Sequence, residues 1–195
     1  MIFDWRKLLL LTHRWLGIAG TILFVVWFVS GIVMMYVRMA TLEEEEHLAR
    51  APVLDLSRAT LSPLQAAEAA GTDVDGLTVG MRGDRPVYRF GGRNGLVVFA
   101  DDGTIFEGVG TAEAETVARQ YAPGHSGPIR YDGYLTEPDQ WTIQSRQAMP
   151  LHRFALDDAA GTHLYVSEVT GNVELRTTRR ERFWAYLGPV LHWSS

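Results

Sequence analysis

A histidine and a series of small and aromatic residues recur at helical spacing near the start of the chain. Residues three or four positions apart share one face of an α-helix. From His13 onward, that face carries Gly17, Gly20, Phe24, Trp27 and Gly31. A histidine nitrogen can ligate haem iron, glycines leave room for a flat macrocycle to approach the backbone, and aromatic rings can line its edge. Packing of two helices through small residues explains the same spacing, so a haem site and a packing surface both remain open.

Four other histidines offer less chemistry. His152 shares one face of a predicted strand with Phe154 and Leu156, which predicts a packed core position, whereas His163 alternates onto a predicted sheet surface. No two histidines have the i, i+4 spacing of a helical zinc motif, and the chain has no nucleophile elbow, phosphate loop or nucleotide fingerprint. The other two, in a Pro-Gly-His-Ser-Gly loop and after an acidic run, are His125 and His47.

The element that must position the His13 face is an uncharged run from Leu16 to Val37. At about 1.5 Å of rise per residue, it is long enough to cross a hydrocarbon core of about 30 Å. Trp15 and Tyr36 stand at its two ends, where aromatic belts form in membrane proteins. A cleaved signal peptide would have a shorter apolar core, of about 7–15 residues, followed by a small-residue cleavage site. We therefore expect a transmembrane helix.

The composition limits the possible functions. The chain has 195 residues, a formal net charge of −5 and no cysteine. This charge gives no reason to expect a nucleic-acid partner, and the absence of cysteine excludes disulfides, iron–sulfur clusters and thiolate metal sites. Basic residues lie on both sides of the apolar run, so charge does not settle the orientation. The run Glu43 to Glu46 is interpreted as part of a solvated linker, over 41–58, that follows the N-terminal segment 1–40.

A first α+β unit is expected over 59–110. Its helix begins with Ser62 as N-cap and Pro63 as first helical residue, with Gln65 as the capping-box partner and Gly71 as the stop. Short β-prone runs separated by Gly or Asp follow it, and a turn over 101–104 joins the last two as a hairpin. These strands are expected at 76–79, 86–90, 95–100 and 105–108.

The same order of elements recurs over 111–182, which predicts a second unit. A helix over 112–121, with Thr111 as its cap, stops before Pro123. Both halves close on a similar hairpin, FADDGTIFEG in the first and YVSEVTGNVEL in the second. We therefore expect an α+β ectodomain made of two copies of a helix-plus-antiparallel-sheet unit. Strands of the second copy are expected at 140–144, 150–156, 162–169 and 172–175.

Several segments resemble one known family. They are LLTHRWLGIAGTILFVVWFVSGIVMMY, LSPLQAAEAAG, DQWTI and DAAGTHLYVSEVTGNVELRTTRRERFWAYLGPVLHW. They resemble the PepSY-associated transmembrane family of bacterial inner-membrane proteins, which are linked to iron and siderophore uptake. The resemblance runs from about Lys7 to Trp193 and is specific in HRWLG and TRRER…LHW. It implies that both units are PepSY-type modules, that the ectodomain is periplasmic and that the N-terminus is cytoplasmic.

The resemblance also bears on the cofactor. Some family members resemble haem-containing reductases of ferric siderophores, which favours haem b at His13, with Gly17 and Gly20 beside it. A histidine near the start of the family's next helix matches His192, which implies a second haem-iron ligand. About 24 residues of helix, or roughly 36 Å, separate His13 from Val37. The two histidines are therefore expected near opposite membrane faces, each on its own haem.

The C-terminal segment 183–195 departs from the family pattern. Family members continue into further membrane spans, whereas the apolar part of this segment is too short to cross a bilayer as a helix. It is interpreted either as the truncated start of a second transmembrane helix, which the resemblance favours, or as an aromatic-rich interfacial segment.

Two functional hypotheses of different classes follow. The first is a haem-dependent electron-transfer protein that reduces ferric iron or a ferric siderophore in the periplasm during iron uptake. It would lie in the lipid bilayer with further transmembrane helices, of the same protein or of another subunit. The second is a membrane-anchored PepSY interaction or peptidase-regulatory module without redox activity.

Overall fold

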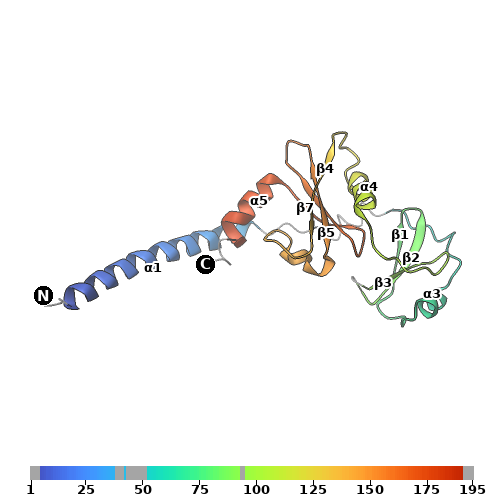
Figure 1. Cartoon of the computed structure of the whole chain (residues 1–195), viewed down its shortest axis with the longest axis horizontal. Helices are drawn as coiled ribbons and strands as arrows, with labels where there is room; N and C mark the ends of the chain where they lie inside the picture. The colour runs from blue at the N-terminus through green and yellow to red at the C-terminus, as the bar shows by residue number, and fades with distance from the viewer. Residues whose placement is uncertain (1–4, 38–41, 43–51, 93–94, 191–195) are drawn as a thin grey trace. The chain divides into compact units, whose positions relative to one another are not determined.

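The computed structural model describes residues 5–37, 42, 52–92 and 95–190. They belong to two compact bodies. The helical body comprises the N-terminal segment and the C-terminal segment that starts at Arg179, and the sheet body comprises Thr41–Thr178. The helical body is helical in its described part, and the sheet body contains two small antiparallel sheets, one in each α+β unit (Figure 1).

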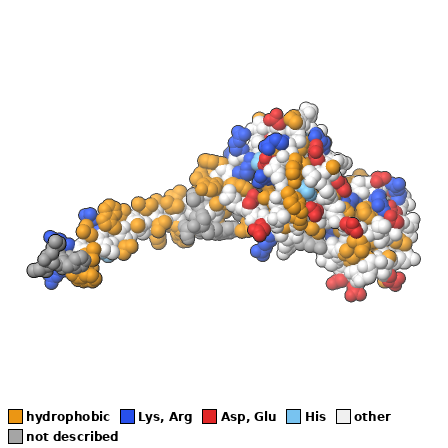
Figure 2. Space-filling model, in the orientation of Figure 1, with side chains coloured by type: hydrophobic (Ala, Val, Ile, Leu, Met, Phe, Trp, Pro, Cys, Tyr) orange, Lys and Arg blue, Asp and Glu red, His pale blue; other side chains and the backbone are white. Residues whose placement is uncertain are grey.

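Helix α1, Trp5–Tyr36, is one uninterrupted helix of 32 residues. Its length is about 48 Å at 1.5 Å per residue, and it is apolar enough to cross a membrane. Ser30 is its only buried residue, and hydrophobic side chains cover much of its visible surface (Figure 2). The helix begins before the predicted run of 16–37, because residues 5–15 are rich in leucine and basic residues of high helix propensity.

The C-terminal segment returns to the end of α1. Helix α5, Arg179–Ala185, continues into η2, Tyr186–Val190, which is a π-helical turn. Gly188 allows the two backbones to approach, because a Cβ atom there would lie 3.1 Å from Cγ1 of Val33 and 3.5 Å from the backbone nitrogen of Met34. The predicted C-terminal segment thus begins as a helix against α1, and its last five residues, His192 among them, lie outside the described residues.

The helix of the first α+β unit is α3, Pro63–Ala70, and it has the predicted ends. The Ser62 hydroxyl accepts from the Gln65 backbone N–H, and the Gln65 side chain accepts in return from the Ser62 backbone N–H. Gly71 ends the helix in the left-handed conformation, with φ 66°. Local side-chain chemistry is therefore sufficient to define this helix.

The first sheet follows α3 as an antiparallel meander in the order β1-β2-β3. Its predicted fourth strand, over 105–108, is reduced to a single bridge between Ile105 and Val98. Ala66 and Ala67 of α3 share a buried apolar cluster with four residues of the sheet side, Tyr88, Phe90, Val98 and Ala100. The strands are β1, Thr78–Arg82, β2, Arg85–Phe90, and β3, Leu96–Phe99.

The second unit begins with α4, Thr111–Tyr121. Its N-cap is Gly110 without a side-chain hydrogen bond, so the prediction of Thr111 as cap was wrong by one residue. Four antiparallel strands follow in the order β4-β5-β6-β7, and α4 packs its buried residues Ala114 and Ala118 on one face of the sheet. The strands are β4, Ile129–Leu135, β5, Leu151–Leu156, β6, His163–Ser167, and β7, Val173–Thr177.

The strand predicted at 140–144 is absent from this sheet. The Asp139 carboxylate accepts from the backbone N–H groups of Trp141 and Thr142 and from the Thr142 hydroxyl, which closes a turn. The turn leads into the short 3₁₀ helix η1, Ile143–Ala148. A local side-chain cap thus overrides the β propensity of this aromatic and β-branched stretch.

The two sheet units share a pattern of backbone hydrogen bonds. At the final turn of the first unit, Gly103 N–H donates to Phe99 and Phe99 N–H donates to Thr104. The second unit repeats both bonds at the equivalent turn, after its third strand, from Gly171 to Ser167 and from Ser167 to Asn172. The residue before each helix N-cap also donates to the residue that follows the third strand, in the pairs Leu61 to Ala100 and Val109 to Glu168.

Candidate functional site

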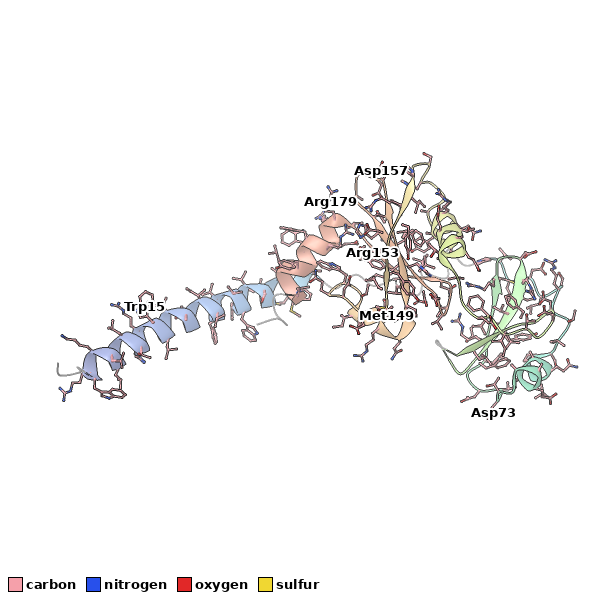
Figure 3. The ribbon with its side chains drawn as sticks, in the orientation of Figure 1. Trp15, Asp73, Met149, Arg153, Asp157 and Arg179 are labelled. Carbon is pink, nitrogen blue, oxygen red and sulfur yellow. The ribbon has the colours of Figure 1, made fainter. Side chains whose placement is uncertain are left out.

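Helix α1 holds His13, Gly17 and Gly20 on one face, as their spacing predicts. His13 is exposed, and a Cβ atom added at Gly17 or Gly20 would meet nothing within 4 Å. Figure 3 labels the neighbouring Trp15 on this part of the helix. The face contains a shallow hollow, which is lined by His13, Arg14, Gly17, Ile18, Thr21 and Ile22.

The two ends of the glycine and aromatic stripe differ. At the C-terminal end of α1, Ser30 is buried and η2 approaches Val33 through Gly188, so small residues serve helix packing there. At the N-terminal end, the positions in front of Gly17 and Gly20 are open. The packing explanation therefore accounts for one end of α1, and the surface around His13 is left without a neighbour among the described residues.

The chemistry of these residues fits one side of a haem. A neutral imidazole nitrogen is an ordinary axial ligand, and two glycines leave the helix backbone accessible to a flat ring. The Thr21 hydroxyl donates to the Gly17 carbonyl at 2.8 Å, so it is already engaged with the helix backbone. Phe24 and Trp27 continue the face, with ring centroids 6.0 Å apart. His13 is the only histidine in α1, so any second axial ligand must come from another segment.

A cluster of polar aromatic and acidic side chains lies around His152 in the second sheet. His152 is buried as predicted, and its Nε2 atom lies 3.2 Å from the Val109 carbonyl, which can only accept. That nitrogen therefore carries a proton, and Nδ1 faces the Tyr131 hydroxyl at 3.4 Å. Tyr134 donates to the Glu168 carboxylate at 2.7 Å, and this hydrogen bond raises the pKa of the Tyr134 hydroxyl.

Sequence reasoning found only one member of this cluster. Tyr131 and Tyr134 lie on β4, which was not predicted as a strand, and Glu168 lies just after β6. The cluster joins the start of α4 to the turn between β6 and β7, because Val109 N–H also donates to the Glu168 carbonyl at 3.0 Å. We interpret it as a structural tie between the segment before α4 and the second sheet, since its polar groups contact one another.

The second face of this sheet is more covered than predicted. His163 is only partly exposed, and Tyr165, on the same face, is fully buried. The β4–β5 connection contacts this face, because the Ala148 carbonyl accepts from the Ser167 hydroxyl at 2.7 Å. The prediction that His163 lies on an open sheet surface was therefore only partly right.

Among the remaining histidines, His125 lies in its loop with Nε2 3.3 Å from the Pro128 carbonyl, and His47 and His192 fall outside the described residues. Within the described part of the chain, no three histidine, cysteine, aspartate or glutamate residues come together in a way that could hold a metal ion. No protein-family model matches the sequence, and no characterised protein or solved structure is significantly similar to it.

Proposed function

We propose that this chain acts in a membrane-bound, haem-dependent electron-transfer protein that reduces ferric iron or a ferric siderophore in the periplasm. The observation that carries the proposal is the open face of α1, where exposed His13 is followed by two glycines with empty space in front of them. The resemblance to inner-membrane iron-uptake proteins supports the same function and suggests the periplasmic placement of the sheets.

In this proposal, each residue of the face has a separate task. His13 provides the axial nitrogen, Gly17 and Gly20 leave the space for the ring, and the apolar side chains around them exclude water. A bound haem b would supply a one-electron carrier. The substrate Fe³⁺ would gain one electron to become Fe²⁺, and the donor would lie in the membrane or on its cytoplasmic side. His192 would serve a second haem near the other membrane face.

The test is haem content in purified native membranes, where any further helices are present. We expect a Soret band, and we expect His13→Ala to remove about half of the haem per polypeptide, because the second proposed site does not use His13. Gly17→Leu should also lower the haem content, since its side chain would fill the space that the ring needs.

A matched control is Ala19→Leu, which adds similar bulk on the side of α1 that points away from His13. This variant should keep its haem. Absence of any Soret band in haem-replete cells, or full retention of haem in His13→Ala, would contradict the proposal. Loss of all haem in His13→Ala with the fold intact would contradict the two-site arrangement alone.

An alternative is a membrane-anchored interaction module, related in role to PepSY-type peptidase regulators, without redox activity. The observation that favours it is β4, an edge strand of the second sheet on which Tyr131 and Tyr134 are exposed. Tyrosines are frequent in protein interfaces. This alternative predicts that membranes contain the folded protein without haem, and that Tyr134→Ala weakens binding to the partner while the fold is kept.

A further inference from the structure

The segment that returns to α1 begins with exposed charges and continues with exposed aromatic rings. Arg179 and Arg180, the first residues of α5, are both exposed. Three aromatic side chains follow within six residues, with exposed fractions of 57% for Phe183, 40% for Trp184 and 48% for Tyr186. Basic residues next to aromatic rings are typical of segments that lie at a lipid headgroup layer.

The contact with α1 fixes the depth of this segment in a bilayer. Gly188 approaches Val33, and Val33 precedes Tyr36 by three residues, or about 4.5 Å along the helix axis. Tyr36 ends α1, one residue before the end of the uncharged run, so this contact lies just inside the hydrocarbon boundary if α1 spans a membrane.

The rise of a helix then places the other residues relative to that contact. Trp184 precedes Gly188 by four residues and lies at most about 6 Å from its level, which corresponds to the interface. Arg180 lies at most about 12 Å away, on the aqueous side, because two guanidinium groups are costly in hydrocarbon. This distance reaches the headgroup phosphates and not far beyond them.

We propose that α5 is an anionic-lipid-binding anchor, in which Arg179 and Arg180 bind headgroup phosphates while Phe183, Trp184 and Tyr186 lie in the interface. The guanidinium groups are complementary in charge to anionic phospholipids and suited to phosphate oxygens. The surface is continuous with α1, the element that could itself enter the bilayer. The proposal depends on α1 spanning a membrane and is independent of haem binding.

The experiment uses the full chain in detergent micelles, titrated with brominated phosphatidylglycerol or brominated phosphatidylcholine. Bromine quenches nearby tryptophan fluorescence, and subtraction of a Trp184→Phe variant isolates the Trp184 signal. We expect Trp184 to be quenched by both lipids, but at a lower mole fraction of phosphatidylglycerol. The preference should reach up to about 25-fold, since each basic residue near an anionic surface contributes a factor of about five.

Charge variants show whether the lipid preference depends on these two arginines or only on the net charge of the chain. Arg179→Gln combined with Arg180→Gln should abolish the preference for phosphatidylglycerol, and the paired lysine substitutions should retain most of it. Arg146→Gln removes an exposed arginine from η1 and should leave the preference for phosphatidylglycerol unchanged. Persistence of the preference in the paired glutamine variant would overturn the proposal, as would equal quenching by both lipids in the unmodified chain. Absence of Trp184 quenching would also overturn it and indicate that protein covers this face.

Discussion

The two sheet units follow one plan but differ in how completely they enclose their cores. The first has three strands and a single bridge in place of the fourth, and its helix α3 carries a full capping box. The second has four strands and a longer helix α4, which starts at Gly110 without a side-chain cap. Both units therefore share the final turn and its backbone hydrogen bonds, whereas the helix caps and the number of strands differ between them.

Arg82 connects the two α+β units. This arginine of β1 donates to the Thr170 carbonyl at 3.0 Å, lies 4.0 Å from the ring centre of Phe106, and is 3.8 Å from Glu113 of α4. Burial lowers the pKa of its guanidinium group. The first unit therefore extends a side chain into the closing turn of the second, so the units are unequal: one supplies the contact and the other receives it.

The largest expected effect comes from a charge placed in either core. Phe90, in the first unit, and Phe154, in the second, are almost completely buried. An aspartate at either position would bury an unpaired charge and cost at least about 4 kcal/mol. Hydrogen exchange measured by mass spectrometry should show Phe90→Asp exposing β1 to β3 while β5 to β7 stay protected. Simultaneous loss of protection in both sheets would instead show a single cooperative unit, and unchanged thermal stability would contradict the assigned core.

Alanine substitutions at the two equivalent turn glycines should lower stability by less than a buried charge does, and by unequal amounts. Gly103 and Gly171 both have positive φ, of 77° and 60°. Alanine costs about 1–2 kcal/mol in that conformation. At Gly171 its Cβ would also lie 1.4 Å from Nη2 of Arg82, whereas at Gly103 the nearest atom is the mobile end of Leu61 at 3.0 Å. Gly171→Ala should therefore lower the unfolding midpoint in urea more than Gly103→Ala. Equal shifts would show that Arg82 does not contribute to the difference.

Substitutions at the N-caps of α3 and α4 should change the free energy of unfolding by about 1 kcal/mol or less. Ser62→Ala should destabilise the first unit by about 1 kcal/mol because it removes the N-cap acceptor. Gly110→Ser supplies an acceptor that α4 lacks and should stabilise the second unit by a few tenths of a kcal/mol. Urea unfolding of both variants checks the pair. Stabilisation by Ser62→Ala, or a large loss in Gly110→Ser, would contradict this description of the two caps.

These comparisons also explain which features could be predicted from sequence. The α3 cap depends on residues within ten positions, so it is readable locally, and the His13 face follows from helical period alone. Strand β4 was missed because Arg130, Asp132 and Gly133 make it polar at the edge of a sheet. The cluster around His152 joins residues from β4, β5 and the turn after β6, and without β4 nothing in the sequence brings them together.

The smallest expected effect is a dependence of the first unit on pH. Arg85 donates two hydrogen bonds of 2.6 Å to Asp101, and these bonds lower the pKa of the Asp101 carboxyl. Because the folded pKa lies below the unfolded value of about 3.9, the unfolded chain binds the proton more readily. The contribution to stability is therefore complete above the unfolded pKa and lost as pH falls through the lower folded pKa.

Asp101→Asn removes this titration and should flatten the acid side of the stability profile, measured by hydrogen exchange of β2 and β3 between pH 5 and the acid limit of folding. Because the Asp101 side chain is 25% exposed, solvent screens the pair and the change in slope should be small. Thr104 forms hydrogen bonds with Asp102 that lower the pKa of that carboxyl too, so part of the slope should remain in the variant. A profile identical to that of the unmodified chain would show that the pair between Arg85 and Asp101 is broken in solution, and Arg85 would then be held at the closing turn by Asp102, 2.7 Å away, and by the Phe99 ring.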